Sequence, residues 1–77
     1  YHISQNWQTR TDMLEALIKK LEGDIAVAEA NINVYLNQSV GIGEHSDIVE
    51  TIEKEVTKIA EADEKIQTIK KYFLNQI

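Results

Sequence analysis

The chain has 77 residues, a net charge of −5 at pH 7, and neither cysteine nor proline. This length allows one small domain, and the lack of cysteine excludes disulfides as a source of its stability. Thirteen acidic residues against eight basic ones argue against binding to nucleic acids or to a membrane surface, because anionic partners select clustered Lys and Arg. We therefore expect long helices or self-association to supply the stability of this chain.

The first half of the chain carries a heptad repeat of mostly aliphatic residues. Two series share the seven-residue spacing, namely Ile18, Ile25 and Ile32, and Leu14, Leu21, Ala28 and Tyr35. This spacing is typical of the a and d positions of a coiled coil. It predicts a helix over about residues 10–39, capped by Thr9 or Thr11, with residue 4 as an alternative start.

The second half predicts another helix after a turn. Gly41 and Gly43 favour a turn over residues 40–46, because glycine adopts the left-handed backbone that ends many helices. Asp47 and Glu50 have the spacing of a capping box, which predicts a helix over about residues 47–76. Its apolar residues recur at helical spacing: Ile48, Ile52, Val56, Ile59, Ala62, Ile66, Ile69 and Phe73.

These elements predict a single all-α domain over residues 1–77. A short loop between two long helices brings them together as an antiparallel, coiled-coil-like hairpin. In this hairpin Ala28 faces Ile59 and Leu14 faces Phe73. The predicted core seam comprises Leu14, Ile18, Leu21, Ile25, Ala28, Ile32, Tyr35, Ile52, Val56, Ile59, Ile66 and Ile69. Asn31 flanks this seam and is expected to face solvent.

Apolar residues outside the seam predict an interaction surface. The members that we expect on this surface are Trp7, Met13, Leu17, Val27, Val34, Tyr72 and Phe73. Left in water they would form the kind of apolar patch that marks an interaction site. We predict that two hairpins bury the patch by pairing into a homodimeric four-helix bundle. The corresponding function is a structural or oligomerisation module. An alternative is a regulatory adaptor or inhibitor whose apolar helix face binds a different protein.

The spacing of polar residues does not predict a catalytic, cofactor or metal site. His45 lies among acidic residues, but adjacent loop residues are a poor zinc-ligand set, and capping accounts for Asp47. We therefore expect a non-enzymatic protein without cofactor or metal. The amino end lacks the basic and apolar segments of a signal peptide, and no apolar run reaches the ~18 residues of a membrane span. Both features favour a cytoplasmic location without membrane contact.

One short segment resembles a known family. Residues 44–50, EHSDIVE, are similar to the tip of the coiled-coil hairpin in bacterial transcript-cleavage factors of the Gre type, which carries Glu-His-Gly-Asp-Leu and a second acid three residues on. The resemblance covers seven residues, and the residues that follow differ from the family. It implies that Asp47 and Glu50 would help to deliver a magnesium ion to a polymerase-like partner.

Overall fold

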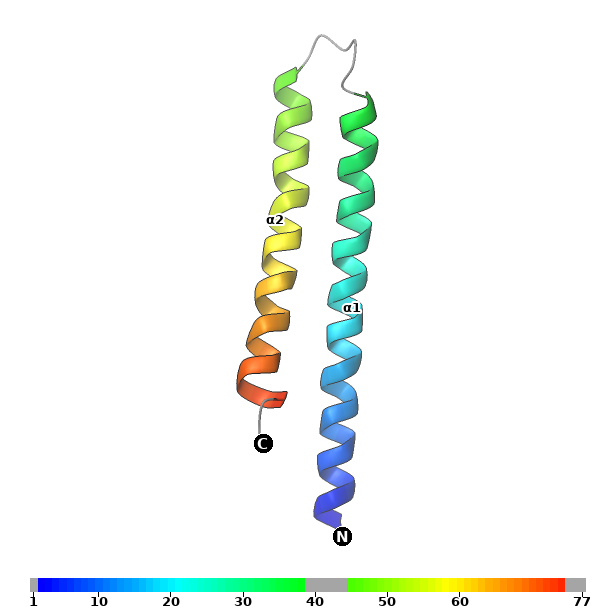
Figure 1. Cartoon of the computed structure of the whole chain (residues 1–77), viewed down its shortest axis with the longest axis vertical. Coiled ribbons are helices and arrows are strands. Elements are labelled where there is room, and N and C mark those ends of the chain that lie inside the picture. The colour runs from blue at the N-terminus through cyan, green and yellow to red at the C-terminus, as the bar shows by residue number, and fades with distance from the viewer. Residues whose placement is uncertain (1, 39–44, 75–77) are drawn as a thin grey trace.

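The computed structural model of the chain describes residues 2–38 and 45–74, with side chains at 8–38 and 47–74. The described residues contain two long helices and no strand. Helix α1 spans His2–Gln38, α2 spans His45–Ile69, and a π-helical segment, η1, follows directly at Lys70–Leu74. The two helices run antiparallel in a rod of 64 × 16 × 15 Å (Figure 1). The predicted all-α hairpin is confirmed.

Helix α1 begins well before the predicted position. It starts at His2, earlier than residue 10 and also earlier than the alternative at residue 4. The sequence offers no proline and no glycine before Gly23 that would interrupt it, and Thr9 and Thr11 lie inside the helix. As a result α1 extends past the end of α2 (Figure 1).

Helix α2 also begins earlier than predicted. It starts at His45, so Asp47 lies in the first helical turn and not at the cap that the predicted capping box requires. A negative charge in the first turn still stabilises the helix through its dipole. Thr51 Oγ1 donates a hydrogen bond to the backbone carbonyl of Asp47 at 2.8 Å. The predicted turn glycines, Gly41 and Gly43, lie outside the described residues.

The core lies between the helices in the half of the rod that is remote from the loop. Its buried apolar side chains are Ile18, Leu21, Ala28, Ala62, Ile66 and Ile69. All of these except Ala28 form one cluster, and Leu14, Ile25 and Leu74 pack against it and are partly buried. Nearer the loop, the predicted seam residues are only half-buried: Ile32, Tyr35, Ile52 and Ile59. The hydrophobic contribution to stability is therefore concentrated at one end.

Val56 does not belong to the seam, and the prediction for it is wrong. Val56 is 50% exposed, whereas Glu55 is only 6% exposed. The physical reason is the seven-residue period, because Glu55 lies seven residues after Ile48 and seven before Ala62. The helix keeps its phase and carries a carboxylate into the seam.

Phe73 does not face Leu14 as the sequence predicts. Phe73 is 47% exposed, and its neighbour Leu74 packs against the core instead. The cause is the π-helical turn, which inserts one extra residue per turn. The residue that follows Ile69 on the core side is therefore the fifth along the chain, Leu74, and not the fourth.

Candidate functional site

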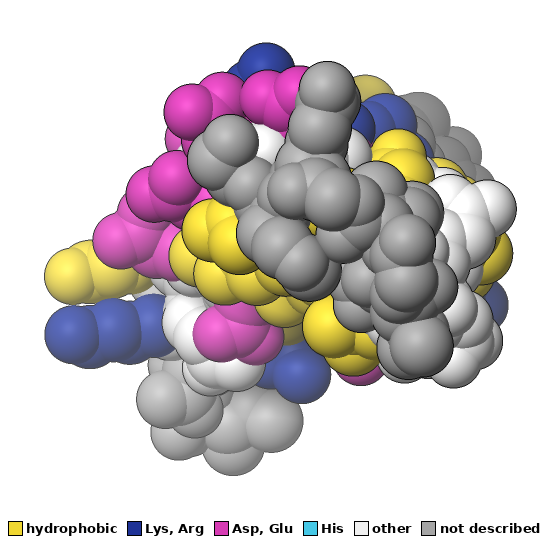
Figure 2. Space-filling view, turned by 90° about the horizontal axis from the view of Figure 1, so that it is seen from above, with side chains coloured by type: hydrophobic (Ala, Val, Ile, Leu, Met, Phe, Trp, Pro, Cys, Tyr) yellow, Lys and Arg dark blue, Asp and Glu magenta, His cyan; other side chains and the backbone are white. Residues whose placement is uncertain are grey.

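A row of exposed apolar side chains follows one flank of α1. Three of them are separated by 14 and 7 residues, which are multiples of the heptad, and the fourth lies one helical turn from the first. We call these four residues the outer stripe: Met13, Leu17, Val27 and Val34. Their side chains are between 42% and 67% exposed. Figure 2, which looks along the rod from above, shows hydrophobic side chains at the outer surface of the molecule.

The outer stripe points in a different direction from the core. With 3.6 residues per turn, its centre lies roughly 110° around α1 from the centre of the seam. Helix α1 thus has two apolar faces, and α2 covers only one of them. This arrangement leaves the four aliphatic side chains against solvent.

A shallow groove runs between the two helices beside the outer stripe. Two hollows of about 330 and 400 Å³ share Leu21 and Lys65, so they follow one another along the same flank. Leu17 and Val27 of the outer stripe line its wall. The floor includes Ala28, and its small side chain leaves the space that forms the hollow.

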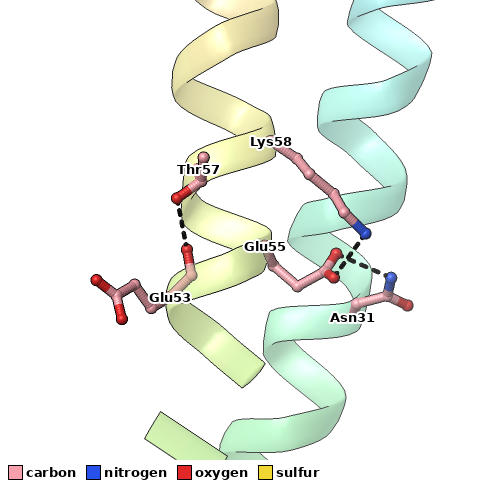
Figure 3. A network of polar contacts seen from close by, with 5 residues as sticks. All are labelled: Asn31, Glu53, Glu55, Thr57 and Lys58. Carbon is pink, nitrogen blue, oxygen red and sulfur yellow. Dashed lines mark hydrogen bonds and ion pairs between the residues drawn. The ribbon is translucent and has the colours of Figure 1, made fainter. Parts of the chain in front are cut away.

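A polar network closes the groove on the side of the loop. Asn31 Nδ2 donates a hydrogen bond to Glu55 Oε1 at 3.1 Å, and Lys58 Nζ donates to Glu55 Oε2 at 2.9 Å. Figure 3 shows the Asn31 side chain of α1 and the Lys58 side chain of α2 both directed at the Glu55 carboxylate. Asn31 is half-buried and does not face solvent, contrary to the prediction.

The network stabilises the charged form of Glu55. The hydrogen bond from Lys58, followed by that from Asn31, holds the pKa of the Glu55 carboxyl below its usual value of 4.5, against the opposing effect of burial. In the described part of the chain, no buried side-chain nitrogen or oxygen lacks a hydrogen-bond partner. The hydrogen bonds from Asn31 and Lys58 thus offset the cost of placing the Glu55 carboxylate in the seam, and the bond from Asn31 links the two helices.

Other exposed apolar residues lie away from the groove. Leu36, Val49 and Val56 are between 50% and 62% exposed, and helical spacing places them on the opposite flank of the hairpin. Their row is short and lies near the loop end. It provides a comparison surface for the outer stripe.

Two aromatic side chains near the open end, Tyr72 and Phe73, are exposed in the described structure. Tyr72 is 58% exposed, Phe73 is 47% exposed, and Lys71 Nζ lies 5.2 Å from the centre of the Tyr72 ring. This distance is within the range of a cation–π contact. The Trp7 side chain lies outside the described part, so its predicted place on the interaction surface remains a prediction.

The acidic segment at the hairpin tip does not gather metal ligands in the described structure. Asp47 and Glu50 are both exposed, Glu44 lies outside the described residues, and so does the His45 side chain. Among the described residues, no group of three His, Cys, Asp or Glu is placed to hold a metal ion. Within the same residues, neither helix is long and apolar enough to cross a membrane.

The sequence pattern identified the members of the outer stripe but missed Glu55 and Asn31. The signal for Glu55 was present, because Ile48, Ala62 and Ile69 share its seven-residue series. Comparison with known proteins gives no match to a protein family, to a curated protein or to a solved structure.

Proposed function

We propose that this chain is a non-enzymatic structural module that acts by self-association, with two hairpins paired through the outer stripe into a homodimeric four-helix bundle. The exposed outer stripe is the observation that supports this proposal most directly. Fully burying a large aliphatic side chain contributes about 1.5–3 kcal/mol. A symmetric dimer would remove four such side chains from water on each copy.

The direction of the outer stripe is suited to a four-helix bundle. Each helix in such a bundle contacts two neighbours in directions at about a right angle, because the four helices stand at the corners of a square. The angle of roughly 110° between the two apolar faces of α1 is close to this requirement. One face contacts α2, and the other is free to contact a second hairpin.

The groove favours a helix over a small molecule as its occupant. Ligand pockets enclose most of their ligand, whereas this groove is shallow and open along the rod. Its walls combine Leu17 and Val27 with charged residues such as Lys65. Protruding side chains from another helix fit such a surface, because apolar atoms enter the groove while charged groups remain at its rim.

The mass of the protein in solution tests this proposal. We expect light scattering behind a sizing column to give about twice the chain mass of 8.8 kDa, with the dimer fraction rising between a low and a high concentration. A chain that remains monomeric at millimolar concentration would contradict self-association. Its stripe would then be a surface for a different protein.

Matched variants connect the dimer to the outer stripe. The double variant Leu17→Gln with Val27→Gln removes the two inner apolar residues of the outer stripe and should yield a monomer. The control, Val49→Gln with Val56→Gln, replaces two exposed apolar residues on the opposite flank and should remain dimeric. Circular dichroism checks that both variants keep their helices. Loss of the dimer in the control alone would show that the interface lies on the flank of Val49 and Val56, and this would contradict the proposal.

A further inference from the structure

The centre of the outer stripe is charged. Lys20 and Asp24 continue its helical spacing between Leu17 and Val27, and Lys20 Nζ lies 2.9 Å from Asp24 Oδ2. The two charged side chains are 68% and 49% exposed. We infer that this charge pair makes α1 complementary to a second copy of itself in one orientation, antiparallel, with the two-fold axis level with Glu22. This inference rests on the proposed self-association and defines its geometry.

The spacing about residue 22 pairs each central residue with its complement. Leu17 and Val27 lie five residues on either side of this level, and Lys20 and Asp24 lie two residues on either side. In an antiparallel pair, Leu17 of one copy therefore faces Val27 of the other, and Lys20 faces Asp24 of the other. The two-fold symmetry repeats each contact, so that apolar groups meet apolar groups and each ammonium meets a carboxylate.

The other orientations lack this complementarity. A parallel pair would place Lys20 beside Lys20 of the second copy and Asp24 beside its own counterpart, and like charges in contact destabilise an interface. An antiparallel pair shifted by one heptad would place Val27 against Asp24 of the second copy, which removes a carboxylate from water without a cation. The charges therefore select both the direction and the register.

Charged residues of α2 are also complementary about the same two-fold axis. The hydrogen bond between Asn31 and Glu55 shows which residues of the two antiparallel helices lie at the same height along the rod. Glu22 of α1 therefore lies at the height of residues 63–64 of α2. Glu61 and Lys65, which line the groove, lie on either side of this level. Two copies of α2 would thus bring Glu61 opposite Lys65 of the other copy. All neighbouring helices in the resulting bundle are antiparallel, as in up-down four-helix bundles.

Disulfide formation between single-cysteine variants tests the orientation. The natural chain has no cysteine, so no other disulfide can form. We expect an equimolar mixture of the Leu17→Cys and Val27→Cys chains, refolded together and oxidised, to give a covalent dimer on a non-reducing gel. Neither variant should give one alone. A mixture of the Leu17→Cys and Val34→Cys chains is the register control, because a one-heptad shift of about 10 Å exceeds the reach of a disulfide.

Each outcome has a separate meaning when the mass of every variant is measured by light scattering and its helicity by circular dichroism. A covalent dimer from either single variant would show a parallel pair and overturn the orientation, while self-association would stand. A covalent dimer from the Leu17 and Val34 mixture would overturn the register. A dimeric mass without any disulfide would place the interface on another face. Monomeric, helical chains would instead refute the proposed function.

Discussion

The hydrogen bond between the helices can be tested by replacing Asn31 with alanine. Asn31 is half-buried and donates at 3.1 Å to the carboxylate of Glu55, whose side chain is only 8% exposed. A hydrogen bond to a charged group contributes about 1.5–3 kcal/mol. Because Asn31→Ala leaves the carboxylate with fewer donors in the seam, we expect it to lower the free energy of unfolding by about this amount at pH 7.

Lys58→Ala is the matched comparison. Lys58 donates to the same carboxylate at 2.9 Å, but its side chain is 63% exposed, so water screens the ion pair and can replace it. Exposed ion pairs of this kind contribute about 0–1 kcal/mol. Urea unfolding followed by circular dichroism, at one protein concentration for all variants, gives both values. If Asn31→Ala costs no more than Lys58→Ala, Asn31 does not bind the carboxylate.

The pH dependence gives this prediction a second readout. Lys58 and Asn31 hold the pKa of Glu55 below 4.5, so the folded chain binds a proton at this site more weakly than the unfolded chain. The stabilisation is therefore complete above pH 4.5 and is lost as the pH falls through the lowered pKa of the folded state. The cost of Asn31→Ala should be smaller at pH 3 than at pH 7. An equal cost at both values would refute a bond to the ionised carboxylate.

Four further variants test the packing, each by its urea or thermal midpoint. Leu21→Ala should cost about 2–5 kcal/mol, because Leu21 is 5% exposed in the core; a near-native midpoint would contradict this position. Gly23→Ala should stabilise α1 by about 0.5–1 kcal/mol, since an added Cβ would meet no atom within 4 Å, and a lower midpoint would be inconsistent with an open helical site. Leu74→Ala should destabilise more than Phe73→Ala, because η1 turns Leu74 toward the core; the reverse order would indicate a regular α-helix there.

The heptad repeat predicted the hairpin because helix phase depends on local periodicity. Ile18, Leu21, Ile66 and Ile69 are buried where the period places them. The same seven-residue period places Glu55 in the seam. The prediction assigned Val56 instead because its side chain is apolar, although Val56 does not fit the period. The phase of a regular helix is therefore a stronger constraint than the polarity of one residue, provided that the polar group has partners.

The core-facing residue at the end of the second helix could not be predicted from the periodicity alone. A π-helical turn moves the core side from Phe73 to Leu74, and both residues are apolar, so the pattern fits either one. The outer stripe is different, because its members were identified only as residues left over from the seam. Their common direction depends on α1 remaining one uninterrupted helix through Gly23.

The polar pair in the seam has a role that an apolar pair could not perform. An aliphatic seam with a seven-residue period tolerates a slip of one heptad, because each aliphatic residue then meets another. A slip toward the amino end of α1 would move Glu55 from Asn31 to the neighbourhood of Asp24, which would replace a hydrogen bond by a repulsion, and a slip in the other direction would also separate Glu55 from Asn31. The network therefore selects the register of the hairpin. That register in turn brings Glu61 and Lys65 level with Glu22, so the proposed dimer axis depends on a side chain in the seam.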